Sequence, residues 1–243
     1  MTARSFRPSR TDAATTVTVA VLVVANLTNN RWAKGWGLLT AVVTVAVLLG
    51  VVRWACADWS ESARVTGLAP DTLARGARWC LAVIGVVAAV YLVGALLPLT
   101  RDLFADQRTS TLPGGTVAAR VLVYVPLGTV FLEEFAFRGA LYGLVRRAHG
   151  TIPATVFSSV LFGLWHILPS LHLATEKPAL TPLFGDSVLG AVAADAGAVL
   201  FTALSGVVFC ELRRRSGSLL APMGLHWATN ALGYIAAYLI AHF

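Results

Sequence analysis

Charged residues are scarce in this chain of 243 residues. Asp, Glu, Lys and Arg make up 13% of the sequence, hydrophobic residues make up 57%, and the mean hydropathy is +0.73. A soluble globular domain is typically about a quarter charged. The shortage of charge therefore argues against a soluble protein and in favour of a membrane protein.

Signatures of several other protein classes are also missing. The three cysteines show no metal-type spacing, and the sequence contains no HExxH zinc-protease motif, internal repeat or low-complexity tract. Without a repeat that carries paired broken helices, a proton-coupled transporter is a weaker alternative. The net charge of +7 could suit nucleic acid, but membrane topology explains it better, so we expect no nucleic-acid partner.

Long uncharged stretches dominate the chain. Most of them approach the roughly 20 apolar residues that cross a bilayer, and backbone groups inside hydrocarbon must be hydrogen-bonded within a helix. We therefore predict an all-α fold, a polytopic transmembrane helical bundle of about seven spans. The predicted spans are residues 13–29, 36–52, 79–99, 117–145, 151–171, 187–210 and 219–241.

Basic residues predict the orientation of these spans. With a cytoplasmic N-terminus, twelve Lys and Arg residues fall on the cytoplasmic side and five on the other, as the positive-inside rule requires. Residues 1–12 then form a basic cytoplasmic segment. Residues 13–116 form the N-terminal transmembrane helices, and residues 117–243 form a C-terminal transmembrane core. We expect a multi-pass protein of the cell membrane, and the excess of Arg over Lys favours a bacterial source.

The first span also resembles a secretory signal peptide, because it follows a basic N-terminus. No small-x-small cleavage site follows it. We expect this span to be kept as a membrane anchor.

Three predicted spans carry polar residues at a similar depth. A charged side chain at the centre of a span costs about 2.5–3.5 kcal/mol even on the mildest scale, so a functional role is the default hypothesis. At 1.5 Å per residue, Glu134, His166, His226 and Asn230 lie about 16–22 Å from the predicted cytoplasmic boundary. The full set of polar residues is Glu133, Glu134, Arg138, His166, His226 and Asn230.

Helical spacing predicts how these side chains face one another. Glu134 and Arg138 are four residues apart and can form an ion pair, whereas Glu133 points about 100° away from Glu134. His226 and Asn230, also four residues apart, share a face. The predicted arrangement is an ion pair beside an unpaired glutamate.

This residue set suits hydrolysis within the membrane. A carboxylate and an imidazole that share a water molecule can make it a nucleophile. A histidine with an asparagine can stabilise an oxyanion. Alternatively, Glu133, His166 and His226 could hold a metal ion such as Zn²⁺. The sequence leaves the metal-dependent and the metal-independent mechanisms open.

Three motifs in this order resemble those of a known protease family. They are EExxxR at residues 133–138, FxxxH at residues 162–166 and HxxxN at residues 226–230. Together they resemble the CAAX protease and bacteriocin-processing family (CPBP, or Abi) of intramembrane endopeptidases, over roughly residues 117–241. The resemblance implies that Glu133 and His166 activate water.

The resemblance also implies roles for the other motif residues and for the substrate. Glu134 and Arg138 would organise the site, and His226 and Asn230 would stabilise the oxyanion. It further implies a membrane-embedded or lipidated protein substrate in contact with membrane lipid. The identity of that substrate and the oligomeric state are not encoded in any motif.

Structural interpretations of the same residues stay open. The glutamates could form an ion-pair cluster that ties helices together, but two glutamates with one arginine leave a buried charge in excess. His226 and Asn230 could join helices by hydrogen bonds. Asp195, in another span, is a weaker candidate for the site. Some members of the family act as non-proteolytic scaffolds or regulators of the cell envelope, which is the main alternative function.

Overall fold

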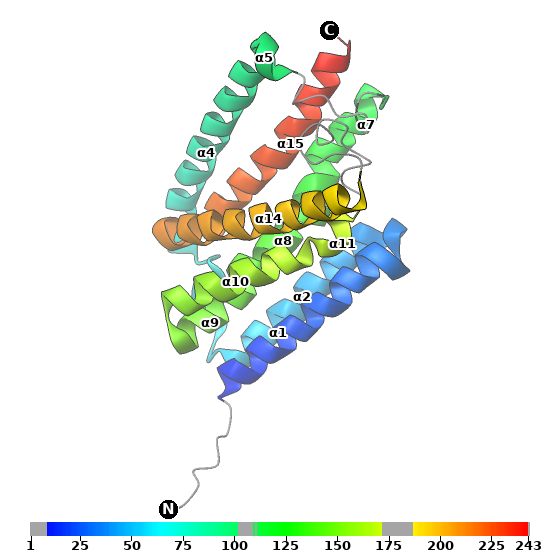
Figure 1. The fold of residues 1–243 in the computed structure, drawn as a ribbon. Coiled ribbons are helices and arrows are strands. Elements are labelled where there is room, and N and C mark those ends of the chain that lie inside the picture. Colours follow the sequence, from blue (N-terminus) through cyan, green and yellow to red (C-terminus); the bar gives the residue numbers. More distant parts are fainter. Residues whose placement is uncertain (1–8, 102–108, 110, 172–186, 243) are drawn as a thin grey trace, which may run out of the picture.

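The computed structural model describes residues 9–101, 109, 111–171 and 187–242 (Figure 1). These residues form helices joined by short turns, and none of them lies in a strand. Of the predicted basic segment 1–12, residues 1–8 lie outside the described part, and a helix already begins at Arg10. Its N-cap is Ser9, which forms a capping box with Asp12.

Six helical stretches are long and apolar enough to cross a membrane. They are α1 with η1 (Arg10–Leu27, Thr28–Trp32), α2 (Gly37–Ala55), α3 with α4 (Trp59–Thr66, Pro70–Leu96), the composite helix Gly114–His149, α10 with α11 (Thr151–Trp165, Ile167–Ser170), and α14 (Val188–Ser216). Short helices η2 (Lys34–Trp36) and α5 (Pro98–Arg101) lie at the ends of α2 and α4. The six stretches correspond to the first six predicted spans.

The seventh predicted span is helix α15, Leu220–His242. Its 23 residues are enough to cross a bilayer. It falls outside the six because polar His226 and Asn230 lower its hydropathy. The start of α1 and the end of α15 lie at opposite ends of the molecule, as an odd number of crossings requires (Figure 1). The prediction of an all-α polytopic bundle of about seven spans is confirmed.

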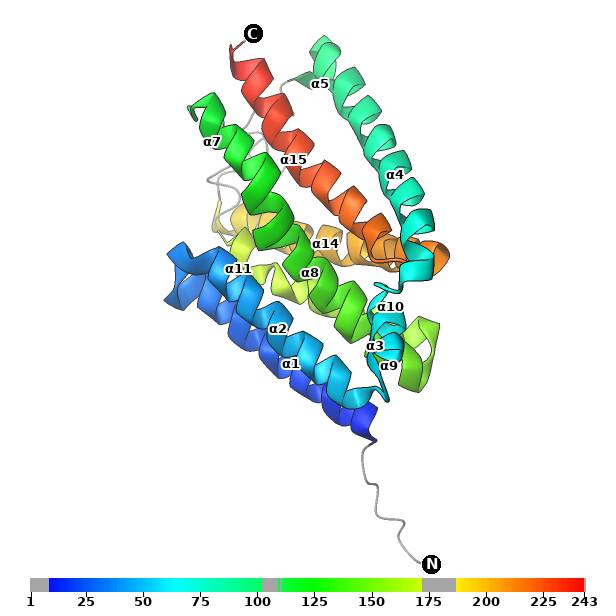
Figure 2. The same cartoon turned by 180° about the vertical axis from the view of Figure 1, so that it is seen from behind.

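The helices pack mainly in pairs. Helix α1 packs along α2, α10 along α14, and α15 along α4. The composite helix lies between the α1–α2 pair and α15 (Figures 1 and 2). It therefore touches both halves of the chain, and it carries both glutamates.

The composite helix does not have regular α-helical winding. It consists of α7 (Gly114–Ala119), the π-helical η4 (Arg120–Phe131), α8 (Leu132–Glu134), the π-helical η5 (Phe135–Leu141) and α9 (Tyr142–His149). The prediction for residues 117–145 treated them as a straight α-helix, and this part of the prediction was wrong. π-Helical turns are rare and are found frequently at functional sites.

Pro126 explains part of this irregular winding. In a π-helix the carbonyl of Val121 would accept the N–H five residues later, but residue 126 is proline and has none. The indole N–H of Trp227 on α15 donates to the Val121 oxygen instead, at 3.1 Å. A side chain of another helix thus replaces the missing backbone donor.

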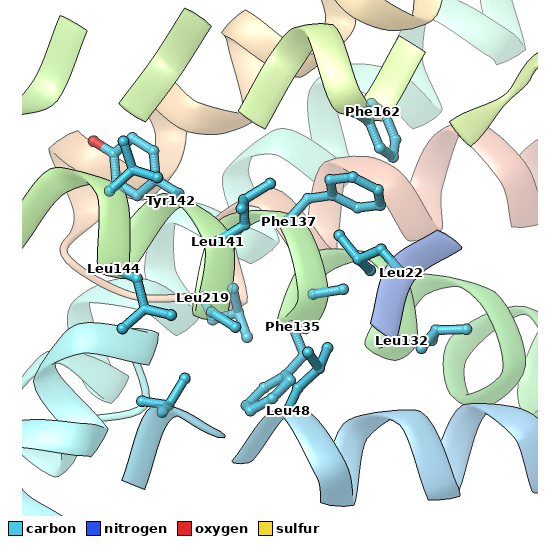
Figure 3. Packing of buried hydrophobic residues seen from close by; sticks show 14 of the residues in the cluster. Leu22, Leu48, Leu132, Phe135, Phe137, Leu141, Tyr142, Leu144, Phe162 and Leu219 are labelled. Atoms are coloured by element: carbon cyan, nitrogen blue, oxygen red, sulfur yellow. The ribbon is translucent and has the colours of Figure 1, made fainter. Parts of the chain in front are cut away.

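The buried hydrophobic core surrounds the composite helix (Figure 3). Phe137 of η5 and Phe162 of α10 point toward each other, with their ring centroids 5.1 Å apart. Leu22 of α1 and Leu48 of α2 belong to the same cluster. The N-terminal helices therefore share one core with the helices that carry the motifs.

Glycine permits two close approaches in this core. A side chain at Gly143 would strike the carbonyl oxygen of Val65, so α9 can pack on the end of α3 only without a Cβ there. At Gly163, a Cβ would lie 2.8 Å from the Cβ of Ala203 on α14. Gly163 thus brings α10 against α14 beside the FxxxH motif.

Candidate active site

Glu134 and Arg138 form a fully buried ion pair. Arg138 Nη1 lies 3.1 Å from Glu134 Oε1, and both side chains are 0% exposed. The contact predicted from the four-residue spacing is therefore present. The guanidinium carbon also lies 3.9 Å from the Phe162 ring centroid and 4.6 Å from that of Phe209. These rings shield the arginine from lipid and attract its positive charge.

His226 joins this pair from helix α15. Its Nδ1 atom lies 2.8 Å from Glu134 Oε1, the oxygen that also accepts from Arg138. Because the carboxylate accepts, Nδ1 is the nitrogen that donates, and Nε2 is directed away from Glu134. The ring stacks on Phe209 with centroids 5.4 Å apart. Glu134 thus fixes the orientation of the histidine.

Glu133 faces the ring nitrogens of two histidines. Its Oε2 atom lies 3.8 Å from His166 Nε2 and 3.8 Å from His226 Nε2. This oxygen is buried and has no hydrogen-bond partner within the described part of the chain. The other oxygen, Oε1, accepts a hydrogen bond from Trp165 Nε1 at 3.1 Å. The indole therefore holds the carboxylate, and Oε2 points toward both rings.

His166 lies at a break between α10 and α11. Its backbone has φ −85° and ψ 0°, in the sparsely populated bridge region where many active-site residues are found. Its Nδ1 lies 2.8 Å from the Phe162 carbonyl oxygen, so Nδ1 donates and Nε2 is free to face Glu133. The break orients the ring toward the glutamate.

Pro169 and Asn26 account for this break. The Trp165 carbonyl would accept the N–H of residue 169 in a continuous α-helix, but proline has none. Asn26 Nδ2 of helix α1 donates to this carbonyl at 2.8 Å. A residue of the first span therefore supports the helix end that carries His166.

Exposure separates the site into two layers. Glu134 and Arg138 are completely buried, whereas the side chains of Glu133 and His166 are 10% and 24% exposed. Groups that act on a substrate must be reachable, and groups that orient them need not be. The side chains of Glu133 and His166 are thus more accessible than those of Glu134 and Arg138 behind them, although Glu133 Oε2 itself is buried.

The two remaining candidates are less closely connected to the glutamates. Asn230 is half-buried on α15, one turn after His226, and makes no hydrogen bond to any residue that the structure describes. Asp195 lines a separate groove of about 550 Å³ between α10 and α14. No hydrogen bond or ion pair among the described residues joins Asp195 to the six motif residues.

The three possible metal ligands are arranged loosely for a metal ion. Two ligands of a tetrahedral Zn²⁺ lie roughly 3.3 Å apart, given metal–ligand bonds of about 2.0–2.1 Å. The carboxylate-to-ring distances are both 3.8 Å. Within residues 9–101, 109, 111–171 and 187–242, no group of three or more His, Cys, Asp or Glu residues has the geometry of a metal site. As arranged, these side chains do not fit a bound metal.

Three residues outside the predicted set also shape the site. Trp165 binds Glu133, Phe209 stacks on His226, and Asn26 supports the break before His166. One signal could have identified Trp165. Most tryptophans of a membrane protein are expected at the interface, but Trp165 lies beside a histidine in the middle of a span. Phe209 and Asn26 carry no comparable signal.

Comparison with known proteins is consistent with these motifs. No curated protein and no solved structure matches the chain. A family model described as Type II CAAX prenyl endopeptidase Rce1-like matches residues 115–232, a stretch that contains all three motifs. Over residues 115–232 this membrane protein is therefore similar to the Rce1-like type II CAAX prenyl endopeptidases, in agreement with the family resemblance of the three motifs.

Proposed function

We propose that the protein is an intramembrane endopeptidase in which Glu133 activates a water molecule. The observation that carries the proposal is the position of Glu133 Oε2, 3.8 Å from the Nε2 atoms of His166 and His226. A buried carboxylate oxygen without a partner is a strong acceptor for a water proton. The family match supports endopeptidase activity in general.

The proposed reaction begins with the water held beside Glu133 and His166. Glu133 takes a proton as the water oxygen bonds to the peptide carbonyl carbon, which creates a tetrahedral oxyanion. The side-chain amide of Asn230 donates to this oxyanion, and His226 donates from Nε2 when that nitrogen carries a proton in addition to Nδ1. When the C–N bond breaks, Glu133 returns the proton to the leaving nitrogen. Atoms and charge balance without a further reactant.

The remaining motif residues position these groups. Glu134 binds Nδ1 of His226, and Arg138 balances the charge of Glu134 in a site that excludes water. The indole of Trp165 fixes Oε1 of Glu133, so Oε2 alone faces the water. Trp165 is thus a positioning residue in this mechanism.

The proposed substrates are membrane-embedded or lipidated proteins. The site belongs to helices that cross the membrane, so a cleaved bond must enter a lipid-surrounded bundle. The family description names prenyl endopeptidases, which is consistent with a lipid attached near the cleaved bond. We propose a scissile peptide bond close to a lipid anchor or a transmembrane segment.

A Zn²⁺-dependent version of the reaction would require a metal ion bound to the purified protein. Glu133, His166 and His226 are the residues that would hold the metal, after moving closer together than they are here. Elemental analysis of the purified protein distinguishes the versions. We expect less than one metal per ten chains and activity that survives chelators; stoichiometric zinc would establish the metal-dependent version.

The proposed activity can be tested with peptides in lipid. The purified wild type and the double variant Glu133→Gln/His166→Ala are placed in liposomes with a library of lipidated and transmembrane peptides. Mass spectrometry then identifies the products. We expect internal cleavage by the wild type alone. Cleavage by both proteins would rule out this site, and cleavage by neither would favour the scaffold function.

A further inference from the structure

A second polar site lies away from the glutamates, at the end of the bundle that the positive-inside rule places in the cytoplasm. It is a pocket of about 220 Å³ between α3, α9 and α14. Its lining residues are Arg64, Val65, Tyr142, Gly143, Arg146, Arg147 and Arg213. We refer to it as the arginine pocket. Four of its seven residues are arginines, so its field attracts anions.

Two lining side chains of the arginine pocket are buried with a free hydrogen-bond donor. Arg213 is 2% exposed and its Nε atom has no hydrogen-bond partner, while Tyr142 is 0% exposed and its hydroxyl also has none. Both statements refer to the described part of the chain. Leaving a buried donor unpaired destabilises a fold. Two such donors in one pocket indicate a ligand that accepts hydrogen bonds.

The geometry around these donors is fixed by the fold. Arg213 Nη2 donates to the carbonyl oxygens of Arg64 and Val65 at 3.2 Å, which holds the guanidinium against the end of α3. The Tyr142 ring packs at one edge of the hydrophobic cluster, and its hydroxyl points away from the other labelled side chains (Figure 3). Arg213 and Tyr142 are therefore the preorganised part of the pocket, and its other three arginines, Arg64, Arg146 and Arg147, are exposed.

The charges around the arginine pocket are largely uncompensated. Glu61 is the acidic residue bound to a lining arginine, and it pairs with Arg147 at 3.0 Å. Arg64 donates to the Ser60 hydroxyl, and exposed Arg146 makes no hydrogen bond or ion pair to the residues described. The nearby Glu211 is occupied by Arg214 and Arg215. An anion in the pocket would supply the missing negative charge.

We propose that the arginine pocket binds a phosphate group. Arginine forks and hydroxyl donors match the oxygens of phosphate, which can accept several hydrogen bonds at once. Basic pockets between transmembrane helices on the cytoplasmic side are suited to lipid headgroups. The phosphate could come from an anionic lipid or from a soluble phosphate compound, and the two sources are separable by experiment.

Binding is measured with the full-length protein in detergent. One arm adds phosphatidylglycerol, detected by native mass spectrometry. The other adds inorganic phosphate, with sodium chloride at equal ionic strength as its control, and follows the melting temperature. Tyr142→Phe and Arg146→Gln test the pocket. Arg215→Gln is the matched control, because Arg215 is exposed at the same end of α14 and pairs with Glu211 outside the pocket.

We expect each pocket variant to weaken binding about tenfold, as loss of a hydrogen bond to a charged group predicts. Binding of phosphatidylglycerol alone identifies a lipid headgroup, and binding of inorganic phosphate as well identifies the phosphate group itself. Tyr142→Phe should melt no lower than the wild type without ligand. The proposal is overturned if neither probe binds, or if both pocket variants bind as tightly as Arg215→Gln. These outcomes do not depend on proteolysis.

Discussion

His226 Nδ1 lies 2.8 Å from Glu134 Oε1, which connects helix α15 to the second glutamate of α8. The same oxygen accepts from Arg138 on η5. The second glutamate is therefore the structural centre of the site, while the first glutamate faces the space between two histidines. The adjacent glutamates thus have different surroundings, which predicts different consequences when each is changed.

Replacement of Arg138 should destabilise the protein as well as inactivate it. Arg138→Ala leaves the Glu134 carboxylate buried without its cation. Removal of one partner of a buried ion pair lowers the free energy of unfolding by about 3–5 kcal/mol. We expect a melting temperature in detergent several degrees below that of the wild type. The double variant Glu134→Gln/Arg138→Ala should recover part of this loss, because no unpaired charge remains. An unchanged melt of Arg138→Ala would contradict the structural role.

Two tryptophans next to motif histidines should respond differently to the same substitution. Trp165→Phe removes the hydrogen bond to Glu133 Oε1, and Trp227→Phe removes the one to the Val121 carbonyl. We expect Trp165→Phe to lower kcat about tenfold, because the carboxylate loses its anchor. Trp227→Phe should leave kcat unchanged and cost about 1–3 kcal/mol of stability, because the Val121 carbonyl loses this donor.

Thermal melts and cleavage rates of both variants in one detergent distinguish these effects. Each variant serves as the control for the other, since both lose one indole N–H and keep an aromatic ring. Equal losses of stability with unchanged kcat would show that Trp165 is only a packing residue.

Asn230 should matter for the reaction and not for the fold. No hydrogen bond connects it to another described residue, so Asn230→Ala should leave the melting temperature within about one degree of the wild type. Loss of an oxyanion donor lowers kcat about 10²–10³-fold. Kinetics on a cleaved peptide should therefore show a lower kcat with little change in KM. A destabilised variant with normal kcat would assign Asn230 to helix packing.

The fold and part of the site could be predicted because both depend on local patterns. Apolar runs indicate the spans, and the four-residue spacing of Glu134 and Arg138 indicates their ion pair. The similar depth of Glu133, His166 and His226 correctly predicted that these residues meet. Each prediction needs only the helical repeat and the length of a span.

Other features depend on contacts between distant segments. Pro126 removes a backbone donor, but the sequence does not reveal that Trp227 replaces it. In the same way, Pro169 removes a donor that Asn26, from the first span, replaces. The helical repeat also could not show that His226 binds Glu134 and stacks on Phe209. These pairings follow from how the helices assemble.

The most direct test of the proposed mechanism is the cleavage rate of Glu133→Gln in liposomes, measured beside the wild type. Glutamine keeps the size of the side chain and an oxygen that can accept from Trp165, but it cannot take a proton from water. The matched control is Glu61→Gln, a half-buried glutamate in α3 far along the chain from the motifs. We expect a rate at least about 10³-fold lower for Glu133→Gln, with an unchanged melting temperature. Retained cleavage by Glu133→Gln would contradict the role of Glu133 as the base.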